Sequence, residues 1–265
     1  MTDGRPPRRA LISGGANGFG LATAAALLQR GDRVTIGDID RRQLDAARAA
    51  LPEDGLHAVE LDVTRPDSVR EAVEAHLATQ GGLDCLVNCA GIIHLAPLAE
   101  IAEEDWDRTI DVDLKGTFLC SQAAAPHLST SGRGRIVNIG SDASHLGFPM
   151  IPHYCAAKHG VLGLTRALAG ELAPGKVTVN CVCPIGVPTT AMGQQVLRWK
   201  MEATGSAAEE IREATAAGIP LGRNATEQDI VQAILFFLSD EAAFITGSAL
   251  DVDGGMMSTI PVPGT

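Results

Sequence analysis

Residues 13–20 read SGGANGFG, and they lie between a short apolar run and a stretch rich in alanine and leucine. Glycines allow the backbone to turn tightly and to approach a pyrophosphate, while the start of a helix offers free N–H groups and a partial positive charge to that anion. The spacing is Gly-x-x-x-Gly-x-Gly rather than Gly-x-Gly-x-x-Gly, so a plain strand-to-helix turn is an alternative. The position after a first strand and before a first helix favours a nucleotide site.

The same alternation of short apolar runs and longer helical patterns continues along the chain of 265 residues. Short, nearly continuous apolar runs are typical of parallel strands that are covered on both faces. We therefore predict an α/β fold with one Rossmann-type domain over residues 1–265, in which helices cover both faces of a doubly wound parallel sheet of about seven strands. The strands are expected at residues 10–13, 34–37, 58–61, 85–88, 135–139, 177–182 and 249–252, and the helices at residues 18–30, 40–50, 66–79, 103–129, 152–173 and 227–239.

Residues 186–220 fit this rhythm least well, and we predict one or two short helices that form a small substrate lobe or lid. The formal net charge of −11 disfavours nucleic acid and anionic membranes as partners. The sequence contains no run of 18 apolar residues, so we predict no membrane span. The six cysteines include no C-x-x-C pair, so we interpret them as small buried side chains in a reducing compartment, the cytoplasm. We expect no metal site; zinc binding by cysteines is the alternative.

An aspartate marks the end of the second expected strand, 18 residues beyond Gly20. The carboxylate of Asp38 can accept hydrogen bonds from an adenosine ribose and would repel a 2′-phosphate. Capping of the next helix is the alternative role, although Asp40 fits that position better. Arg41 and Arg42 follow directly and could receive a phosphate. We expect NAD to be favoured over NADP.

The chain has one tyrosine, Tyr154, and Lys158 follows it by four residues, which is about one helical turn. A nearby ammonium stabilises the phenolate and lowers its pKa from about 10, which suits general acid–base catalysis. A buried tyrosine beside an unrelated lysine is the alternative. Ser141 lies 13 residues before Tyr154, just past the fifth expected strand, where its hydroxyl could hold a substrate oxygen or could simply belong to a turn.

These motifs together resemble the short-chain dehydrogenase/reductase family over nearly the whole chain. The glycine loop resembles the cofactor loop of the family, Asp62-Val63 resembles its adenine-contacting pair, and residues 88–91 (NCAG) resemble its Asn-Asn-Ala-Gly motif. Ser141, Tyr154 and Lys158 match its catalytic residues in order and spacing. The resemblance implies a seven-stranded Rossmann-type sheet, a nicotinamide dinucleotide and a homotetramer built on helices 103–129 and 152–173. The dinucleotide contacts that it implies are Gly14, Asn17, Gly18, Phe19, Gly20, Asp38, Ile39, Asp62, Val63, Asn88, Ala90, Gly91, Tyr154, Lys158, Pro184, Val187 and Thr189.

Two positions depart from the family pattern. Asp113 stands where the family commonly has a catalytic asparagine that helps to hold a relay water near the lysine. We favour the view that a backbone carbonyl preserves the relay; alternatively, the carboxylate adds a charge near Lys158 and changes the proton chemistry. Ile185 stands where glycine is common, in residues 184–189 (PIGVPT).

We therefore predict an oxidoreductase that acts on CH–OH groups and transfers a hydride between NAD(H) and a secondary alcohol or ketone. A catalytically impaired dinucleotide-binding regulator or scaffold is the alternative, but such a chain would be free to lose its catalytic residues. The predicted substrate contacts suit a medium-sized, cyclic alcohol, although the two histidines among them could simply be polar surface residues. These contacts are His94, Ser141, His145, Phe148, Met192 and Trp199.

Overall fold

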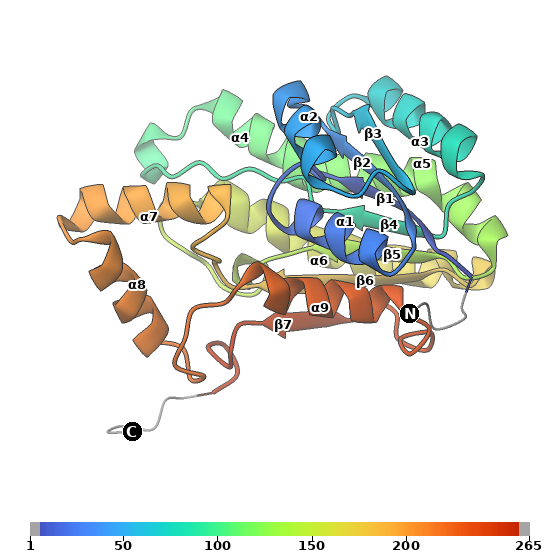
Figure 1. Ribbon diagram of the computed structural model, residues 1–265. Helices are drawn as coiled ribbons and strands as arrows, with labels where there is room; N and C mark the ends of the chain where they lie inside the picture. Colours follow the sequence, from blue (N-terminus) through green and yellow to red (C-terminus); the bar gives the residue numbers. More distant parts are fainter. Residues whose placement is uncertain (1–5, 260–265) are drawn as a thin grey trace.

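The computed structural model describes residues 6–259, and its centre is one parallel sheet of seven strands in the order β3-β2-β1-β4-β5-β6-β7 (Figure 1). This order reverses between β1 and β4, and in open α/β sheets such a reversal opens a crevice at the carboxyl ends of the strands. The predicted fold class is confirmed. The strands are β1 (Arg9–Ser13), β2 (Arg33–Asp38), β3 (Leu56–Glu60), β4 (Cys85–Asn88), β5 (Arg135–Ile139), β6 (Thr178–Pro184) and β7 (Ala249–Val252).

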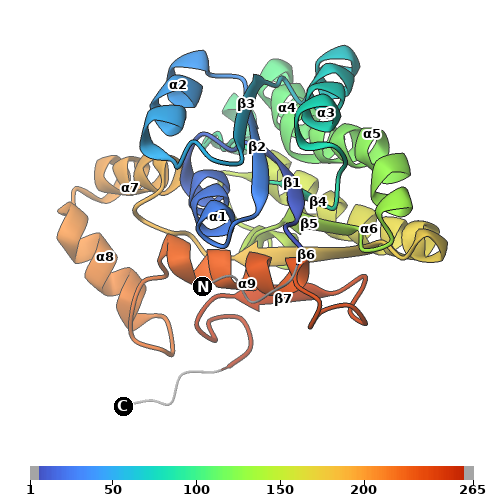
Figure 2. The same cartoon turned by 45° about the vertical axis from the view of Figure 1, so that its right-hand side comes forward.

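Helices cover both faces of this sheet because successive strand residues point to opposite sides (Figure 2). Ala10 and Ile12 pack in a core with helices α1, α2 and α9, whereas Leu11 packs in a second core with α3, α5 and α6. The helices are α1 (Gly18–Gln29), α2 (Arg41–Ala50), α3 (Pro66–Gln80), α4 (Glu103–Ile110), α5 (Gly116–Ser131), α6 (Pro152–Leu172), α7 (Ala191–Thr204), α8 (Ala208–Ala217) and α9 (Glu227–Leu238).

The helix expected over residues 103–129 is interrupted, which corrects the prediction. A π-helical turn, η2 (Asp111–Lys115), lies between α4 and α5, and its backbone is wound more widely than that of an α-helix. The carboxylate of Asp113 accepts a hydrogen bond from the backbone N–H of Ile92 at 2.8 Å, in the loop after β4. The π-turn therefore holds an acidic side chain against a loop that lies 21 residues earlier in the sequence. Such turns occur often at functional sites.

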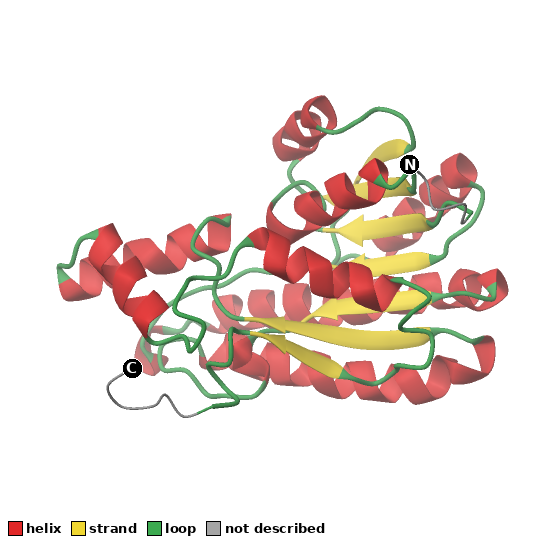
Figure 3. Ribbon diagram, turned by 60° about the horizontal axis from the view of Figure 1, so that its bottom comes forward, coloured by secondary structure: helices red, strands yellow, loops and turns green. Residues whose placement is uncertain are grey.

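The segment 186–220 forms α7 and α8, as expected, and these helices stand beside the sheet rather than over it. The hydroxyl of Thr190 accepts the N–H of Gly193 and so begins α7, and a left-handed Gly205 ends it. Figure 3 shows the arrowheads of the strands pointing toward these two helices. Within residues 6–259, no helix is both long and apolar enough to cross a bilayer.

Candidate active site

A cavity of about 1170 Å³ lies at the carboxyl ends of the strands and extends to α7 and α8. Most of the residues predicted from the sequence line its wall: Gly14, Asn17, Gly18, Phe19, Gly20, Asp38, Ile39, Asp62, Val63, Ala90, Gly91, Ser141, Phe148, Tyr154, Lys158, Pro184, Val187, Met192 and Trp199. The predicted residues that lie off the wall are Asn88, His94, Asp113, His145 and Thr189. The structure thus gathers segments from the whole length of the chain around one space.

The glycine loop between β1 and α1 forms one end of this cavity. Gly14 has φ of 64°, and a Cβ there would lie 2.7 Å from the backbone nitrogen of Ala90, so a side chain is excluded. Asn17 precedes α1, and its side chain makes no capping bond; its amide NH2 instead donates to Gln43 at 2.9 Å. The first N–H groups of α1 therefore have no side-chain cap where the helix meets the cavity. This arrangement fits a pyrophosphate.

Asp38 at the end of β2 and Asp40 just after it take different roles, one at the cavity and the other as the cap of the next helix. The carboxylate of Asp40 accepts the N–H groups of Arg42 and Gln43, so it caps α2. Asp38 lies on the cavity wall, where its carboxylate accepts the N–H groups of Ala16 at 3.3 Å and Asp40 at 3.1 Å. Each of these bonds uses one oxygen, and each oxygen retains a lone pair for a ribose hydroxyl.

The arginines behind Asp38 differ in their contacts. Arg41 donates from Nε to Glu60 at 2.7 Å, across the end of the neighbouring strand β3. Neither Arg41 nor Arg42 lines the cavity. The negative charge that faces the cavity here is therefore not offset by a cation on the wall beside it.

The middle of the cavity is lined by the segments after β3 and β4. Asp62 accepts hydrogen bonds from the backbone and the hydroxyl of Thr64, which orders the turn after β3. Asn88, by contrast, lies inside the sheet, where its amide donates to Asn138 at 2.8 Å and to Ser121 at 3.2 Å. The structure therefore corrects its predicted role: Asn88 joins β4 to β5 and α5 behind the wall rather than lining the cavity.

Three of the four residues predicted for catalysis, Ser141, Tyr154 and Lys158, lie together at the other end. Tyr154 and Lys158 lie on α6, and the ammonium nitrogen is 5.4 Å from the centre of the phenol ring. Lys158 donates to the backbone oxygen of Ile139 at 3.0 Å, which fixes its side chain at the end of β5. Ser141 follows β5, and its hydroxyl donates to Asp142 at 2.6 Å. The hydroxyl, the phenol and the ammonium therefore face one region of the cavity.

The pKa of Tyr154 departs from the expectation of a net decrease. Burial raises the pKa of this phenol above its ordinary value, Lys158 and a hydrogen bond with Ser141 lower it, and Asp113 raises it further. The effect of the lysine has the predicted sign but is smaller than the cost of burying a phenolate.

Asp113 lies behind the wall, fully buried, and faces Lys158. Burial raises the pKa of Asp113 to about 6, although the positive charge of Lys158 lowers it. Among residues 6–259, the second carboxylate oxygen of Asp113 has no hydrogen-bond partner. The backbone oxygen accepts the hydroxyl of Thr117 at 2.9 Å. The carboxylate therefore adds a charge near Lys158, as the second alternative expects, whereas the relay water held by a backbone carbonyl, which we favour, stays a prediction.

The substrate end of the cavity is largely apolar. Phe148 and Met192 pack beside Tyr154, and the phenol oxygen lies 3.9 Å from the sulfur of Met192. The two predicted histidines lie elsewhere, which corrects their assignment to the wall. His94 points toward Asp105, with 3.7 Å between Nδ1 and Oδ2, and His145 forms an ion pair of 3.1 Å with Asp251.

The segment after β6 forms the wall near Lys158. Pro184, Ile185 and Val187 line the cavity, so isoleucine at the usual glycine position is compatible with it. Thr189 lies off the wall and donates to Glu227 at 2.7 Å. Its neighbour Thr190 lines the cavity instead, and sequence analysis missed it; its position before the helical pattern, typical of an N-cap, could have identified it.

Comparison with known proteins agrees with this geometry. A family model described as enoyl-(acyl carrier protein) reductase matches residues 14–257. The chain is 39% identical to 2-(S)-hydroxypropyl-CoM dehydrogenase 3 of Xanthobacter autotrophicus, over 92% of this chain and 94% of that protein. It is 37% identical to cyclopentanol dehydrogenase of a Comamonas species, over 92% and 95% of the two chains. A crystal structure of an actinorhodin polyketide ketoreductase variant with NADPH superposes with a TM-score of 0.90, at 31% identity over 96% and 98% of the chains.

Proposed function

The chain belongs to the short-chain dehydrogenase/reductase family, and from this premise we propose that it interconverts a secondary alcohol and a ketone with NAD(H), using Tyr154 as the general acid and base. One observation carries the proposal. Tyr154, Lys158 and Ser141 meet at one end of a cavity whose other end is formed by the glycine loop and Asp38. A dinucleotide held by that loop would reach the catalytic residues.

Each catalytic residue has a separate task in the oxidation. With substrate bound, the hydroxyl of Ser141 would turn from Asp142 and donate to the oxygen of the substrate, and the phenolate of Tyr154 removes the hydroxyl proton of the substrate. The ammonium of Lys158 stabilises that phenolate and, fixed by Ile139, would have its remaining N–H groups free to hold the ribose of a bound nicotinamide nucleotide. When bound, the nicotinamide supplies the acceptor for the hydride. In the reduction, Tyr154 returns the proton to the ketone oxygen.

The proposed preference for NAD rests on charge at the ribose end. The carboxylate of Asp38 would lie close to a 2′-phosphate and repel it, while Arg41 is engaged by Glu60. The actinorhodin ketoreductase structure contains NADPH, so membership of the family does not by itself identify the cofactor of this chain. The local charge of each chain, rather than the fold, then decides the preference.

The alternative of a catalytically impaired regulator or scaffold gains no support. The hydroxyl, phenol and ammonium are all present and lie around the same region. Relatives over nearly the whole chain carry the names of dehydrogenases that act on alcohols, such as D-threitol dehydrogenase of Mycolicibacterium smegmatis.

For the substrate we propose a medium-sized, cyclic secondary alcohol. Phe148, Met192 and Trp199 give this end of the cavity an apolar wall, and helices α7 and α8, which contribute lining residues, would serve as its lid. Two relatives are named for cyclic alcohols, cyclopentanol dehydrogenase and cis-4-hydroxycyclohexanecarboxylate dehydrogenase of Sinomonas cyclohexanicum. Apolar walls of this kind bind rings by removing their surface from water.

We also propose a homotetramer in the cytoplasm. The outer faces of α4 and α5 expose Trp106 and Phe118, which a second copy could cover. All six cysteines are free thiols, which suits a reducing compartment. Light scattering at micromolar concentration tests the assembly, and a monomer would contradict it.

The function is tested by mixing the purified chain with NAD or NADP and a panel of cyclic and linear secondary alcohols, with NADH or NADPH absorbance as the readout. We expect turnover of cyclic alcohols with NAD at a kcat/KM at least about tenfold higher than with NADP, the effect of about 1.4 kcal/mol. Binding of NADH without turnover of any alcohol, or of any ketone in the reverse direction, would revive the regulator hypothesis.

A further inference from the structure

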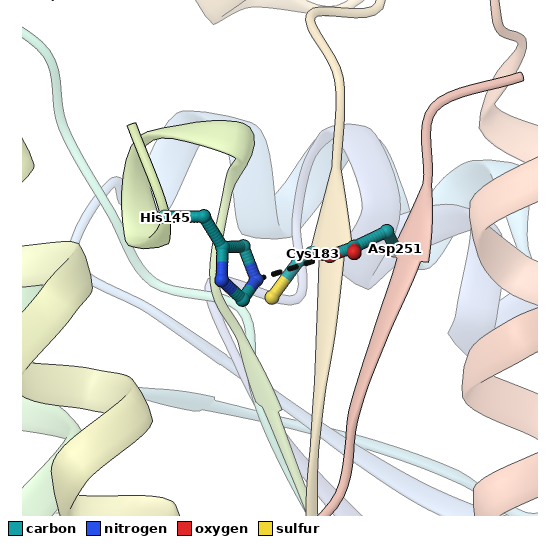
Figure 4. A group of neighbouring side chains, drawn as sticks. All are labelled: His145, Cys183 and Asp251. Atoms are coloured by element: carbon teal, nitrogen blue, oxygen red, sulfur yellow. Dashed lines mark ion pairs between the residues drawn. The ribbon is translucent and has the colours of Figure 1, made fainter. Parts of the chain in front are cut away.

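Outside the cavity, three side chains of different chemistry converge behind the wall that carries Ser141 (Figure 4). His145 follows the short helix η3 (Asp142–Ser144), Cys183 lies in β6, and Asp251 is its register partner in β7. The ring nitrogen Nε2, the sulfur and a carboxylate oxygen all lie within 4.8 Å of one another. None of the three lines the cavity, so the proposed reaction leaves the cluster without a role.

We propose that His145, Cys183 and Asp251 bind a Zn²⁺ ion. Imidazole nitrogen, thiolate sulfur and carboxylate oxygen are the three ligand types that zinc takes in proteins, and a thiolate disfavours Mg²⁺ and Ca²⁺. Three protein ligands leave the fourth tetrahedral position to water.

The geometry is close to what such a site needs. Bonds of about 2.0–2.2 Å in a tetrahedron separate a nitrogen and an oxygen ligand by roughly 3.4 Å. Nε2 of His145 and Oδ1 of Asp251 are 3.1 Å apart, so small side-chain rotations suffice. The side chains of His145 and Asp251 are 28% and 33% exposed, whereas Cys183 is buried. An ion could therefore enter past the histidine and the aspartate and meet the thiolate at the inner end.

The position of the site gives the ion a structural task. His145 lies four residues beyond Ser141, after a turn in which Ser141 and Ser144 cap each other. Cys183 directly precedes Pro184 on the cavity wall. The sulfur of Cys181 lies 3.7 Å from that of Cys183 and encloses the site from within. Bound zinc would join the segment after β5 and strand β6 to the edge strand β7, and so hold Ser141 and Pro184 in register without touching substrate.

The experiment uses the full chain after treatment with a chelator, titrated with Zn²⁺ by calorimetry and with Co²⁺ by absorption spectroscopy. We expect one Zn²⁺ per chain, a higher Tm with zinc, and a thiolate-to-cobalt charge-transfer band with Co²⁺. Each of the variants Cys183→Ser, His145→Gln and Asp251→Asn should lower the zinc affinity by about tenfold or more, and Cys183→Ser should abolish the band. The matched controls Cys120→Ala and His127→Gln, which lie away from the cluster, should retain both.

Circular dichroism and NADH binding establish that each variant is folded, and the His145 and Asp251 variants decide the matter if Cys183→Ser does not fold. The proposal is overturned if the wild-type chain binds no zinc at micromolar concentration. It is equally overturned if the three variants bind zinc as tightly as the controls. In both cases the cluster is an ion pair beside a buried thiol.

Discussion

Asp113 and Lys158 face one another beside Gly91, and both are buried. A Cβ built on that glycine would lie 2.9 Å from a carboxylate oxygen of Asp113 and 3.6 Å from the ammonium nitrogen of Lys158. Burial lowers the pKa of Lys158, but the carboxylate of Asp113 raises it, and the overall change is an increase. The same carboxylate also raises the pKa of Tyr154. The lysine therefore acts on the phenol while a carboxylate opposes part of its effect.

This relationship predicts the effect of Asp113→Asn. The amide oxygen can still accept the N–H of Ile92, while the charge that raises the pKa of Tyr154 is lost. The phenolate then forms at lower pH, so the pH profile of kcat for oxidation should move toward lower pH, with more phenolate present at any fixed pH below the pKa. Because the pKa of Asp113 is about 6, wild type and variant should converge below pH 6 and diverge above it.

The exposed variant Asp45→Asn, on α2, is the matched control and should leave the profile in place. An unmoved profile in Asp113→Asn would mean that the carboxylate is tolerated without effect on the phenol. A rise in kcat of a hundredfold or more would mean that the natural chain is impaired in catalysis.

The role of the phenol predicts the behaviour of Tyr154→Phe. Removing only the proton carrier should lower kcat by two to four orders of magnitude, roughly the contribution of general acid–base catalysis, and leave NADH binding unchanged. Lys158→Ala should reduce both kcat and the affinity for NADH, because this side chain serves both steps. Stopped-flow turnover and NADH fluorescence titration separate the two. Retention of more than about a tenth of the wild-type kcat in Tyr154→Phe would rule out the assignment.

The sequence predicted those parts of the site that depend on neighbouring residues. The alternation of strands and helices along the chain, the glycine loop and the spacing of Tyr154 and Lys158 follow from local pattern, since strand ends and helical turns place nearby residues by fixed geometry. The π-turn did not follow, because it depends on a hydrogen bond between Asp113 and Ile92 from another loop.

Long-range partners also explain the misplaced side chains. His145 is drawn to Asp251, which lies 106 residues later and becomes a neighbour only when β7 joins β6. Asn88 pairs with Asn138 across β4 and β5. A single sequence shows that such residues are polar and near a strand end, but not which partner competes for them.

The ribose end of the cavity predicts a change of cofactor preference in Asp38→Asn. The amide oxygen can keep a bond with the N–H of Ala16, but the negative charge that repels a 2′-phosphate is removed. The ratio of kcat/KM for NAD to that for NADP should fall by about tenfold or more. Adding Glu60→Gln should lower it further, because Arg41 then loses its anionic partner. The variant Asp45→Asn, which changes an exposed side chain of α2 away from the cavity wall, should keep the wild-type ratio, and an unchanged ratio in Asp38→Asn would contradict the proposed role.

Stability at the opposite end of the sheet depends on Asp84. Its buried carboxylate accepts hydrogen bonds from Arg9 and Arg133 at 2.9–3.2 Å. Burial alone would raise the pKa of Asp84, but these bonds lower it to about 2. A lowered carboxylate pKa stabilises the fold at pH values above the unfolded pKa, near 4, and this stability is lost as pH falls toward 2.

Asp84→Asn should therefore lower the free energy of unfolding by at least about 2 kcal/mol at pH 7. The loss is smaller than for a fully buried pair because both arginines reach solvent. Thermal unfolding from pH 7 to 2 should show a Tm several degrees lower that converges on wild type in acid. The control is Asp67→Asn, which breaks an exposed ion pair with Arg70. An equal loss of Tm in that variant would contradict the role of Asp84.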